Sequence, residues 1–316
     1  MSHVQEPSAS SLAAAPPDRP WVILGCGYTG SRLARHLVTD GAQVWLTRQS
    51  AEAATAQARA LGGGAIGRRL ALDDPASLRE LADWMPEGAW VVDSIPPGSR
   101  EPDGERELVA IAARRHTRRL VYLSSTSVYP PGDGSWIDEE REVGPTSGRG
   151  TARLRAESAL LEAARAQPLS AVSLRIVGIY GPGRGVHARL HKGTYRIVGD
   201  GQTYVNRVHV DDLVSAIVAA ARAPELARAV YHVADDMPER TAIYAHAMAE
   251  IMGVPQPPMV PESEVAPWIV SMLRANRRVS NKRMKDELGV TLRYPSWREG
   301  LRQVLDEDQI PLPGAD

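Results

Sequence analysis

A glycine-rich hexapeptide near the N-terminus is the feature of this sequence that most directly suggests chemistry. It has the pattern Gly-x-Gly-x-x-Gly, follows the apolar run Trp21–Leu24, and opens a stretch with helical spacing. In that context the glycines permit a tight turn, a close approach to a pyrophosphate and a close contact between helix and strand, and the helix N-terminus attracts the anion. The pattern predicts a dinucleotide site, with an ordinary turn as the alternative, formed by Gly25, Cys26, Gly27, Tyr28, Thr29 and Gly30.

The end of the second predicted strand indicates which dinucleotide is bound. A site for NAD carries a carboxylate about 20 residues after the turn, where it accepts hydrogen bonds from the ribose hydroxyls. This sequence has Arg48 near that position, preceded by Thr47. Because a guanidinium suits a 2′-phosphate, NADP(H) is the expected cofactor and NAD(H) the alternative. A solvated surface arginine is the other interpretation of Arg48.

Short apolar runs alternate with segments of helical spacing, which predicts an α/β fold with a doubly wound parallel sheet. The predicted strands are Trp21–Leu24, Gln43–Thr47, Ala65–Leu70, Trp90–Ile95, Arg119–Ser124 and Ala171–Val177. The predicted helices are Thr29–Val38, Ala51–Leu61, one beginning near Pro75, Glu105–Arg115 and Gly150–Ala166. Past Val177 we expect a loop at 181–185, strands Val205–Val210 and Tyr231–Val233, a helix Asp211–Arg222 with Asp212 as its N-cap, and further helices.

This alternation divides the chain into three regions. Residues 1–19 are expected to form a disordered leader, which lacks the basic start and long apolar stretch of a secretion signal. Residues 20–177 form the predicted dinucleotide-binding domain of Rossmann type. Residues 178–316 form a smaller, mostly helical substrate lobe that is interleaved with the sheet edge. Ligands would bind in the cleft between the lobe and the carboxyl ends of the strands.

Four segments resemble signatures of the extended short-chain dehydrogenases/reductases, and they follow that family's order. Val121-Tyr-Leu-Ser-Ser-Thr-Ser-Val-Tyr129 is similar to its strand-five segment, and Leu174-Arg-Ile-Val-Gly-Ile-Tyr-Gly-Pro-Gly183 to its strand-six signature. Val208-His-Val-Asp-Asp212 and Ser280-Asn-Lys-Arg-Met-Lys-Asp-Glu-Leu-Gly289 are similar to later motifs. The Gly-x-Gly-Tyr-Thr-Gly turn resembles an atypical branch of NAD(P)-binding, epimerase/dehydratase-like proteins. The resemblance implies an oxidoreductase or epimerase-like activity.

The resemblance also assigns positions to catalytic groups. Ser125 occupies the place of the family's catalytic serine, which would hydrogen-bond a substrate carbonyl or hydroxyl; a serine that caps backbone groups is the alternative. The family's Tyr-x-x-x-Lys pair falls on Arg149 and Arg153, and no tyrosine lies between Trp136 and Ile179. Arginine stays protonated, so Arg149 cannot pass on a proton, whereas Arg153 can still donate hydrogen bonds to the cofactor's ribose.

If the protein is a reductase, another residue must supply the proton. Tyr129 is the catalytic candidate; Tyr180 and His187 are further candidates that we also expect to line the substrate site, with simple packing as the alternative for each. Family members that act on nucleotide sugars hold the diphosphate with an arginine, at whose position this sequence has Val205. Arg207 lies two residues later on the same strand face. Arg207 can therefore replace that arginine in part, and we expect it in the substrate site. Because the diphosphate site is incomplete, a small polar metabolite is expected rather than a nucleotide sugar.

The composition of the chain limits which classes of binding partner we expect. The 37 basic and 38 acidic residues leave a net charge of −1, which argues against nucleic acid, and no apolar run reaches the length of a membrane span. The single cysteine excludes an internal disulfide and favours the cytoplasm. Histidines near 187–191 lack a matching ligand set, so no metal site is expected. The leading hypothesis is an NADP(H)-dependent enzyme with a small-molecule substrate; the alternative is a catalytically silent dinucleotide-binding sensor or scaffold. A homodimer stays open.

Overall fold

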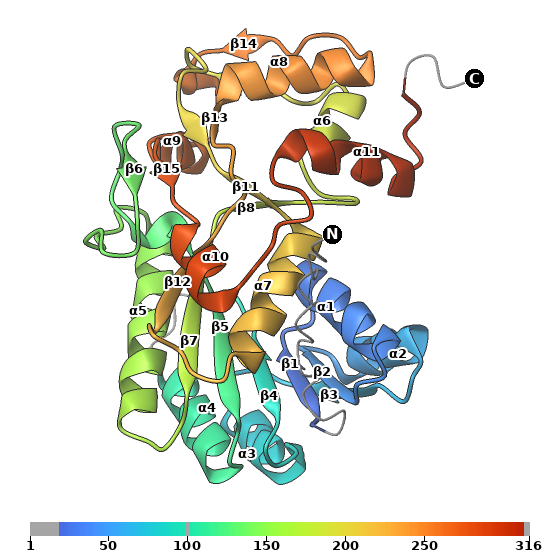
Figure 1. Ribbon diagram of the computed structural model, residues 1–316, viewed down its shortest axis with the longest axis vertical. Helices are drawn as coiled ribbons and strands as arrows, with labels where there is room; N and C mark the ends of the chain where they lie inside the picture. The colour runs from blue at the N-terminus through green and yellow to red at the C-terminus, as the bar shows by residue number, and fades with distance from the viewer. Residues whose placement is uncertain (1–18, 99–101, 313–316) are drawn as a thin grey trace, which may run out of the picture.

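A seven-stranded parallel sheet forms the body of the molecule (Figure 1). The computed structural model describes residues 19–98 and 102–312. All neighbouring strands of this sheet run parallel, in the order β12-β7-β5-β4-β1-β2-β3. They are β1 (Trp21–Leu24), β2 (Val44–Arg48), β3 (Ile66–Arg69), β4 (Trp90–Asp93), β5 (Arg119–Ser125), β7 (Ala171–Ile176) and β12 (Val230–Val233).

Helices cover both faces of the sheet, as its near-continuous apolar strands require. All four side chains of β1, for example, are buried. One face packs against α1 (Tyr28–Thr39), α2 (Ala51–Leu61) and α7 (Val210–Arg222). The other packs against α3 (Pro75–Trp84), α4 (Asp103–Arg114) and α5 (Gly148–Arg165). The predicted doubly wound α/β fold is therefore confirmed.

A smaller lobe stands next to the sheet and has a hydrophobic core of its own, around Tyr180, Tyr244 and Trp297 (Figure 1). Its helices are α6 (Val186–His191), α8 (Thr241–Met252), α9 (Pro267–Leu273) and α11 (Trp297–Glu307). Helix α10 (Lys282–Leu288) packs against α7 and β12 of the body. Short paired strands connect its segments: β8 (Gly178–Tyr180) with β11 (Arg207–His209), β9 (Ile197–Val198) with β14 (Met259–Val260), β10 (Tyr204–Val205) with β13 (Glu239–Arg240), and β6 (Trp136–Ile137) with β15 (Arg278–Val279). Between its parts the chain returns to the sheet as α7 and β12.

The single strand predicted at Val205–Val210 is wrong. The chain is interrupted at Asn206, so that β10 and β11 pair with different partners. The Asn206 side chain donates a hydrogen bond to the carbonyl of Arg277 and accepts one from the N–H of Val279, both at 2.8 Å. These bonds tie the segment to the start of β15 and separate the two strands.

The prediction of Asp212 as a helix cap is also wrong. The N-cap of α7 is His209, whose Nδ1 accepts a hydrogen bond from the N–H of Asp211 at 3.1 Å. Asp212 lies inside the helix, and its carboxylate accepts the N–H groups of Arg293 and Tyr294 at 2.7 and 2.9 Å. It therefore fastens the segment before α11 to α7.

The predicted leader lies outside the described residues except for Arg19. Within the described ranges, the helices are all too short or too polar to cross a membrane.

Candidate dinucleotide and active site

The three glycines of the turn between β1 and α1 meet different surroundings. Gly25 has a φ of +75°, and a Cβ there would lie 2.8 Å from Cγ1 of Ile95. A Cβ at Gly30 would lie 3.1 Å from Cγ2 of Ile23, so this glycine lets α1 pack closely on β1. At Gly27 the nearest atom to an added Cβ is the carbonyl oxygen of Gly25, 3.9 Å away. The space in front of Gly27 is therefore open, as a pyrophosphate that approaches the backbone requires.

The end of β2 holds this turn. Thr47 Oγ1 accepts the N–H of Gly25 at 2.9 Å, and the N–H of Cys26 donates to the Thr47 carbonyl at 2.8 Å. Arg48 Nη1 donates to the carbonyl of Cys26 at 2.7 Å. The structure thus brings Arg48 to the predicted turn, with a half-buried guanidinium at its edge.

Cys26 faces inward and supports the turn. Its thiol is fully buried and accepts a hydrogen bond from Nε2 of Gln57 at 3.2 Å. Burial raises the pKa of this thiol to about 11, so it is uncharged at neutral pH. Thr29, in the first turn of α1, is also buried.

Tyr28 connects the turn to the lobe. Its hydroxyl donates to the carbonyl of Pro182 at 3.0 Å, and the guanidinium of Arg184 lies 5.1 Å from the centre of its ring. One turn further along α1, Arg32 pairs with Asp211 of α7 at 2.6 Å and with Glu307 of α11 at 2.8 Å. The lobe is therefore fastened over the glycine-rich turn.

Ser125 is the last residue of β5, and the carboxyl ends of parallel strands share one edge of the sheet. It is half-buried, and its Oγ accepts the N–H of Ser127 at 3.1 Å, which caps a short 3-10 helix over Thr126–Val128. Ser125 thus lies at the same edge as the turn and Arg48. Its oxygen already makes the backbone contact considered as the alternative to catalysis.

Tyr129 belongs to a buried polar relay. Its hydroxyl lies 2.7 Å from both Nη1 of Arg175 and Nε2 of His232. Since Nδ1 of His232 faces the carbonyl of Ser280 at 3.2 Å, that nitrogen carries the proton and Nε2 accepts one from Tyr129. Glu157 completes the relay by holding Arg175 at 2.6 Å. Burial raises the pKa of Tyr129, and its proton points to His232.

Helix α5 contains neither tyrosine nor lysine. Arg153 Nη1 donates to the carbonyl of Leu123 at 2.9 Å, which places this guanidinium beside the carboxyl end of β5. Arg149 is exposed, and its guanidinium lies 5.4 Å from the centre of the Trp268 ring of α9. Arg153 thus lies near the end of β5, and Arg149 lies against the lobe. Neither arginine can act as an acid at neutral pH.

Tyr180 packs in the core of the lobe. Its hydroxyl donates a long bond of 3.4 Å to the carbonyl of Ser296, and its ring stands edge-on to His209 at 5.1 Å. Burial raises the pKa of Tyr180.

His187 and Arg207 also make their contacts within the lobe. Nε2 of the buried His187 lies 2.9 Å from Oδ2 of Asp308, while burial lowers the pKa of the imidazole. The guanidinium of Arg207 lies 5.1 Å from the centre of the Tyr244 ring. The contacts of the three predicted substrate residues are thus to the lobe, not to Ser125.

Comparison with known proteins gives the family. The model of the NAD dependent epimerase/dehydratase family matches residues 99–234. A Streptomyces protein, 3-diazoavenalumate denitrifying reductase, is 30% identical over 213 residues, which are 63% of this chain and 69% of that protein. The chain belongs to the NAD-dependent epimerase/dehydratase family. Membership supports an NAD-dependent role of oxidoreductase or epimerase type and confirms the family resemblance of the sequence motifs.

Solved structures of other proteins share this fold over nearly their whole length and over most of this chain. A conserved protein of unknown function from Silicibacter pomeroyi has 31% sequence identity and a TM-score of 0.76, with 92% of this chain and 99% of that chain covered. The UDP-glucose 4-epimerase of Thermotoga maritima, solved with UDP-glucose, has 20% identity and a TM-score of 0.76, with 92% and 98% covered. At that identity the second likeness concerns the fold alone.

No role was predicted for Glu157 or Arg175, although Arg175 lies within the segment that resembles the strand-six signature. Ser173 also donates to Glu157, at 2.9 Å, so this carboxylate joins α5 to β7 inside the protein. Arg175 carries a signal in the sequence, because it is a charged residue in a buried and mostly apolar strand and so implies a buried partner. Glu157 lies in a helix with several other charged residues and does not stand out there.

Proposed function

We propose that this family member is an NADP(H)-dependent oxidoreductase or epimerase-like enzyme that acts on a small polar metabolite in the cytoplasm. The observation that carries the proposal is the position of Arg48, 2.7 Å from the carbonyl of the glycine-rich turn. An arginine at the end of β2 can form charge-assisted, two-pronged hydrogen bonds with a phosphate. In the described chain, β2 ends in Thr47 and Arg48 rather than in a carboxylate.

The residues present fit a dinucleotide. The open space at Gly27 and the unpaired N–H groups of the first turn of α1 suit the pyrophosphate. Arg48 would hold the 2′-phosphate and Arg153 the ribose beside β5. When bound, the cofactor would supply hydride transfer. The chain's own task would be to orient the substrate oxygen, for which Ser125 stands at the end of β5.

Helix α5 offers no donor for the proton that accompanies hydride transfer, because it contains neither tyrosine nor lysine. The hydroxyl of Tyr129 lies in the relay between Arg175 and His232, so it reaches a substrate only if the relay rearranges. We propose that Ser125 binds the reacting oxygen and that water or the substrate's own hydroxyl delivers the proton. A pH–rate profile without an ionisation in the range of tyrosine is the expected signature.

The substrate is proposed to be smaller than the UDP-glucose bound by the Thermotoga enzyme. The place of the diphosphate-binding arginine is taken by Val205 in β10, and Arg207 of β11 stacks on Tyr244 inside the lobe. We further propose that neither nucleic acid nor membrane is a partner.

Exchanging Arg48 tests the cofactor. We expect the native protein to bind NADPH at least tenfold more tightly than NADH, because hydrogen bonds to charged groups contribute about 1.5–3 kcal/mol. Arg48→Asp should reverse this order, since it replaces a phosphate partner by an acceptor for ribose hydroxyls. Calorimetric titration of both cofactors measures it. The matched control is Arg69→Ala, which changes the neighbouring strand's arginine, already paired with Asp74. Equal affinities of the native protein for both cofactors would refute the assignment.

A catalytically silent dinucleotide-binding sensor or scaffold is the second candidate, and the absence of tyrosine and lysine from α5 favours it. A screen of small carbonyl compounds with NADPH separates the two. Turnover that Ser125→Ala reduces supports the enzyme. Tight cofactor binding without turnover, both in the native protein and in Arg149→Tyr/Arg153→Lys, supports the silent protein.

A further inference from the structure

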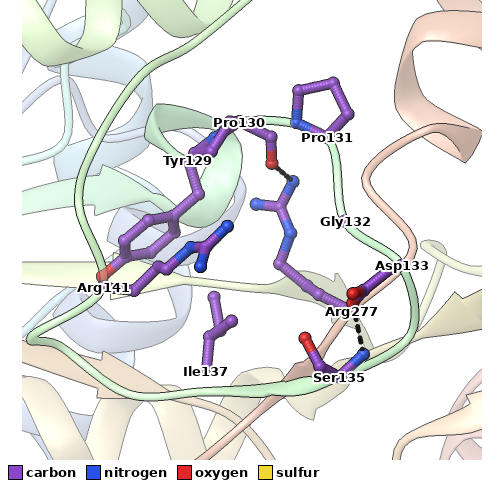
Figure 2. Close-up of a pocket in the computed structure, with 9 residues that line it drawn as sticks. All are labelled: Tyr129, Pro130, Pro131, Gly132, Asp133, Ser135, Ile137, Arg141 and Arg277. Atoms are coloured by element: carbon purple, nitrogen blue, oxygen red, sulfur yellow. Dashed lines mark hydrogen bonds between the residues drawn. The ribbon is translucent and has the colours of Figure 1, made fainter.

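A cavity of about 240 Å³ lies between the loop after β5 and the start of β15 (Figure 2). The loop from Tyr129 to Arg141 surrounds it, and Arg277 enters from the other side. Both guanidinium groups point into the enclosed space (Figure 2). The cavity lining includes neither the glycine-rich turn nor Arg48, and the proposed function assigns the cavity no ligand. Tyr129, the last residue of the strand-five motif, is the one lining residue that the family motifs include.

Arg277 carries a buried positive charge that no carboxylate neutralises. Its side chain donates to three backbone carbonyls, those of Ala275 (2.7 Å), Thr126 (2.8 Å) and Pro130 (2.6 Å). Among the described residues, none of the acidic groups approaches its guanidinium within the 4.0 Å of an ion pair. A buried charge is costly unless it is paired. One hydrogen on each terminal nitrogen is left over after the carbonyl bonds.

Arg141 adds a second positive charge to the same cavity. It is exposed, and in the described part of the chain its guanidinium makes no ion pair either. Burial and the charge of Arg141 lower the pKa of Arg277 to about 10, against the opposing influence of Tyr129. Both guanidinium groups line the same cavity, so their charges add there (Figure 2).

The cavity keeps a net positive charge when its acidic lining is included. Asp133 is the acidic residue of the lining, and its Oδ1 accepts the N–H of Ser135 at 2.9 Å. Two guanidinium groups against one carboxylate leave an unbalanced cation. The phenol of Tyr129 adds no charge, because its hydroxyl is turned to Arg175 and His232. An anion would balance the cavity; a neutral or cationic ligand would not.

We propose that this cavity is a binding site for a small anion, a carboxylate or a phosphate ester, held between Arg277 and Arg141. Its volume suits a few heavy atoms beyond the anionic group rather than a nucleotide. The leftover donors of Arg277 bind it from the buried side, and Arg141 covers it from the solvent side. Arg277 also donates to the carbonyl of Thr126, the residue after Ser125. The bound anion would therefore be linked through Arg277 to the backbone next to the proposed active-site serine.

Calorimetric titration of two probes, inorganic phosphate and malonate, tests the site. The parent protein carries Gly27→Val, so that the glycine-rich turn is not available to the probes. We expect at least one probe to bind, and Arg141→Ala to weaken its binding at least tenfold. Arg141→Ala removes an exposed side chain with no ion pair in the described structure, so the fold should persist. The matched control is Arg274→Ala, another exposed arginine whose backbone carbonyl accepts the N–H of Gly132.

A charge reversal gives a second, independent readout. Arg141→Glu would place a carboxylate opposite Arg277, so we expect its melting temperature to rise less with added phosphate than that of the parent does. Tighter binding of phosphate or of malonate identifies the anionic group of the natural ligand. If neither probe binds, or if Arg141→Ala and Arg274→Ala bind equally well, the proposal is overturned. Both measurements are made without turnover or cofactor, so their failure is distinct from failure of the proposed function.

Discussion

At the scale of single residues, the glycines of the turn separate binding from stability. Gly27→Val should weaken cofactor binding by about 100-fold, a loss of about 2.7 kcal/mol, because the side chain fills the space of the pyrophosphate. The free energy of unfolding should change by less than about 1 kcal/mol, since the nearest atom to the added Cβ is 3.9 Å away. Titration calorimetry and urea unfolding measure the two quantities.

Gly30→Val provides the contrast. Its Cβ would lie 3.1 Å from Cγ2 of Ile23, within the contact of α1 with β1, so this variant should lose stability. If Gly27→Val binds cofactor normally, the pyrophosphate does not lie at this glycine.

At the scale of elements, the relay around Glu157 joins α5, β7 and β12. Glu157→Gln leaves the buried guanidinium of Arg175 without its counter-charge, and removing one partner of a buried pair costs about 3–5 kcal/mol. We expect a loss of that size in the free energy of unfolding, measured by urea denaturation at neutral pH. Glu162→Gln, an exposed position on the same helix, is the control and should stay near the native value. A loss below about 1 kcal/mol for Glu157→Gln would show that the pair adds little.

The same scale shows what sequence patterns could and could not establish. Apolar runs such as Val91–Val92 and helical spacing such as that of α1 sufficed for the sheet, because burial on both faces is visible in composition. The break at Asn206 was not visible, because it depends on hydrogen bonds to a segment about 70 residues away in sequence. Asp212 was misassigned for the same reason. Its carboxylate accepts the distant N–H groups of Arg293 and Tyr294 instead of capping the start of its own helix.

For the site, local motifs sufficed to bring Arg48 to the turn, because the carboxyl ends of neighbouring parallel strands must meet. Arg277 could not be found in this way. Its sequence context, beside Arg278, reads as a solvated basic pair, and only the folded chain buries it.

At the scale of the whole molecule, buried neutral histidines make stability depend on pH. Burial lowers the pKa of His232 to about 3 and that of His209 to about 4, against an ordinary value of 6.5. The unfolded chain then binds protons that the folded one refuses, so the free energy of unfolding should fall as pH drops below 6.5. Each histidine contributes a slope of up to about 1.4 kcal/mol per pH unit.

Carboxyl groups with raised pKa, such as Asp235 and Asp212, act in the opposite direction. The contribution of His232 is therefore measured as the difference between the native protein and His232→Gln. That difference should shrink steadily from pH 6 to pH 4 in urea titrations. A difference independent of pH would mean that His232 titrates normally in the folded protein.

The buried thiol of Cys26 in the glycine-rich turn makes the opening of that turn measurable by thiol labelling. Cys26 is the single cysteine of the chain, its thiol has no exposure, and with a pKa of about 11 only about a thousandth of it is ionised at pH 8. A thiol reagent can therefore react only in the brief moments when the first turn of α1 separates from β2. The labelling rate therefore reports how often the turn opens at the place where Arg48 contacts it. A ligand that bridges Arg48 and the glycine-rich turn should slow the labelling of Cys26, because it stabilises the closed turn.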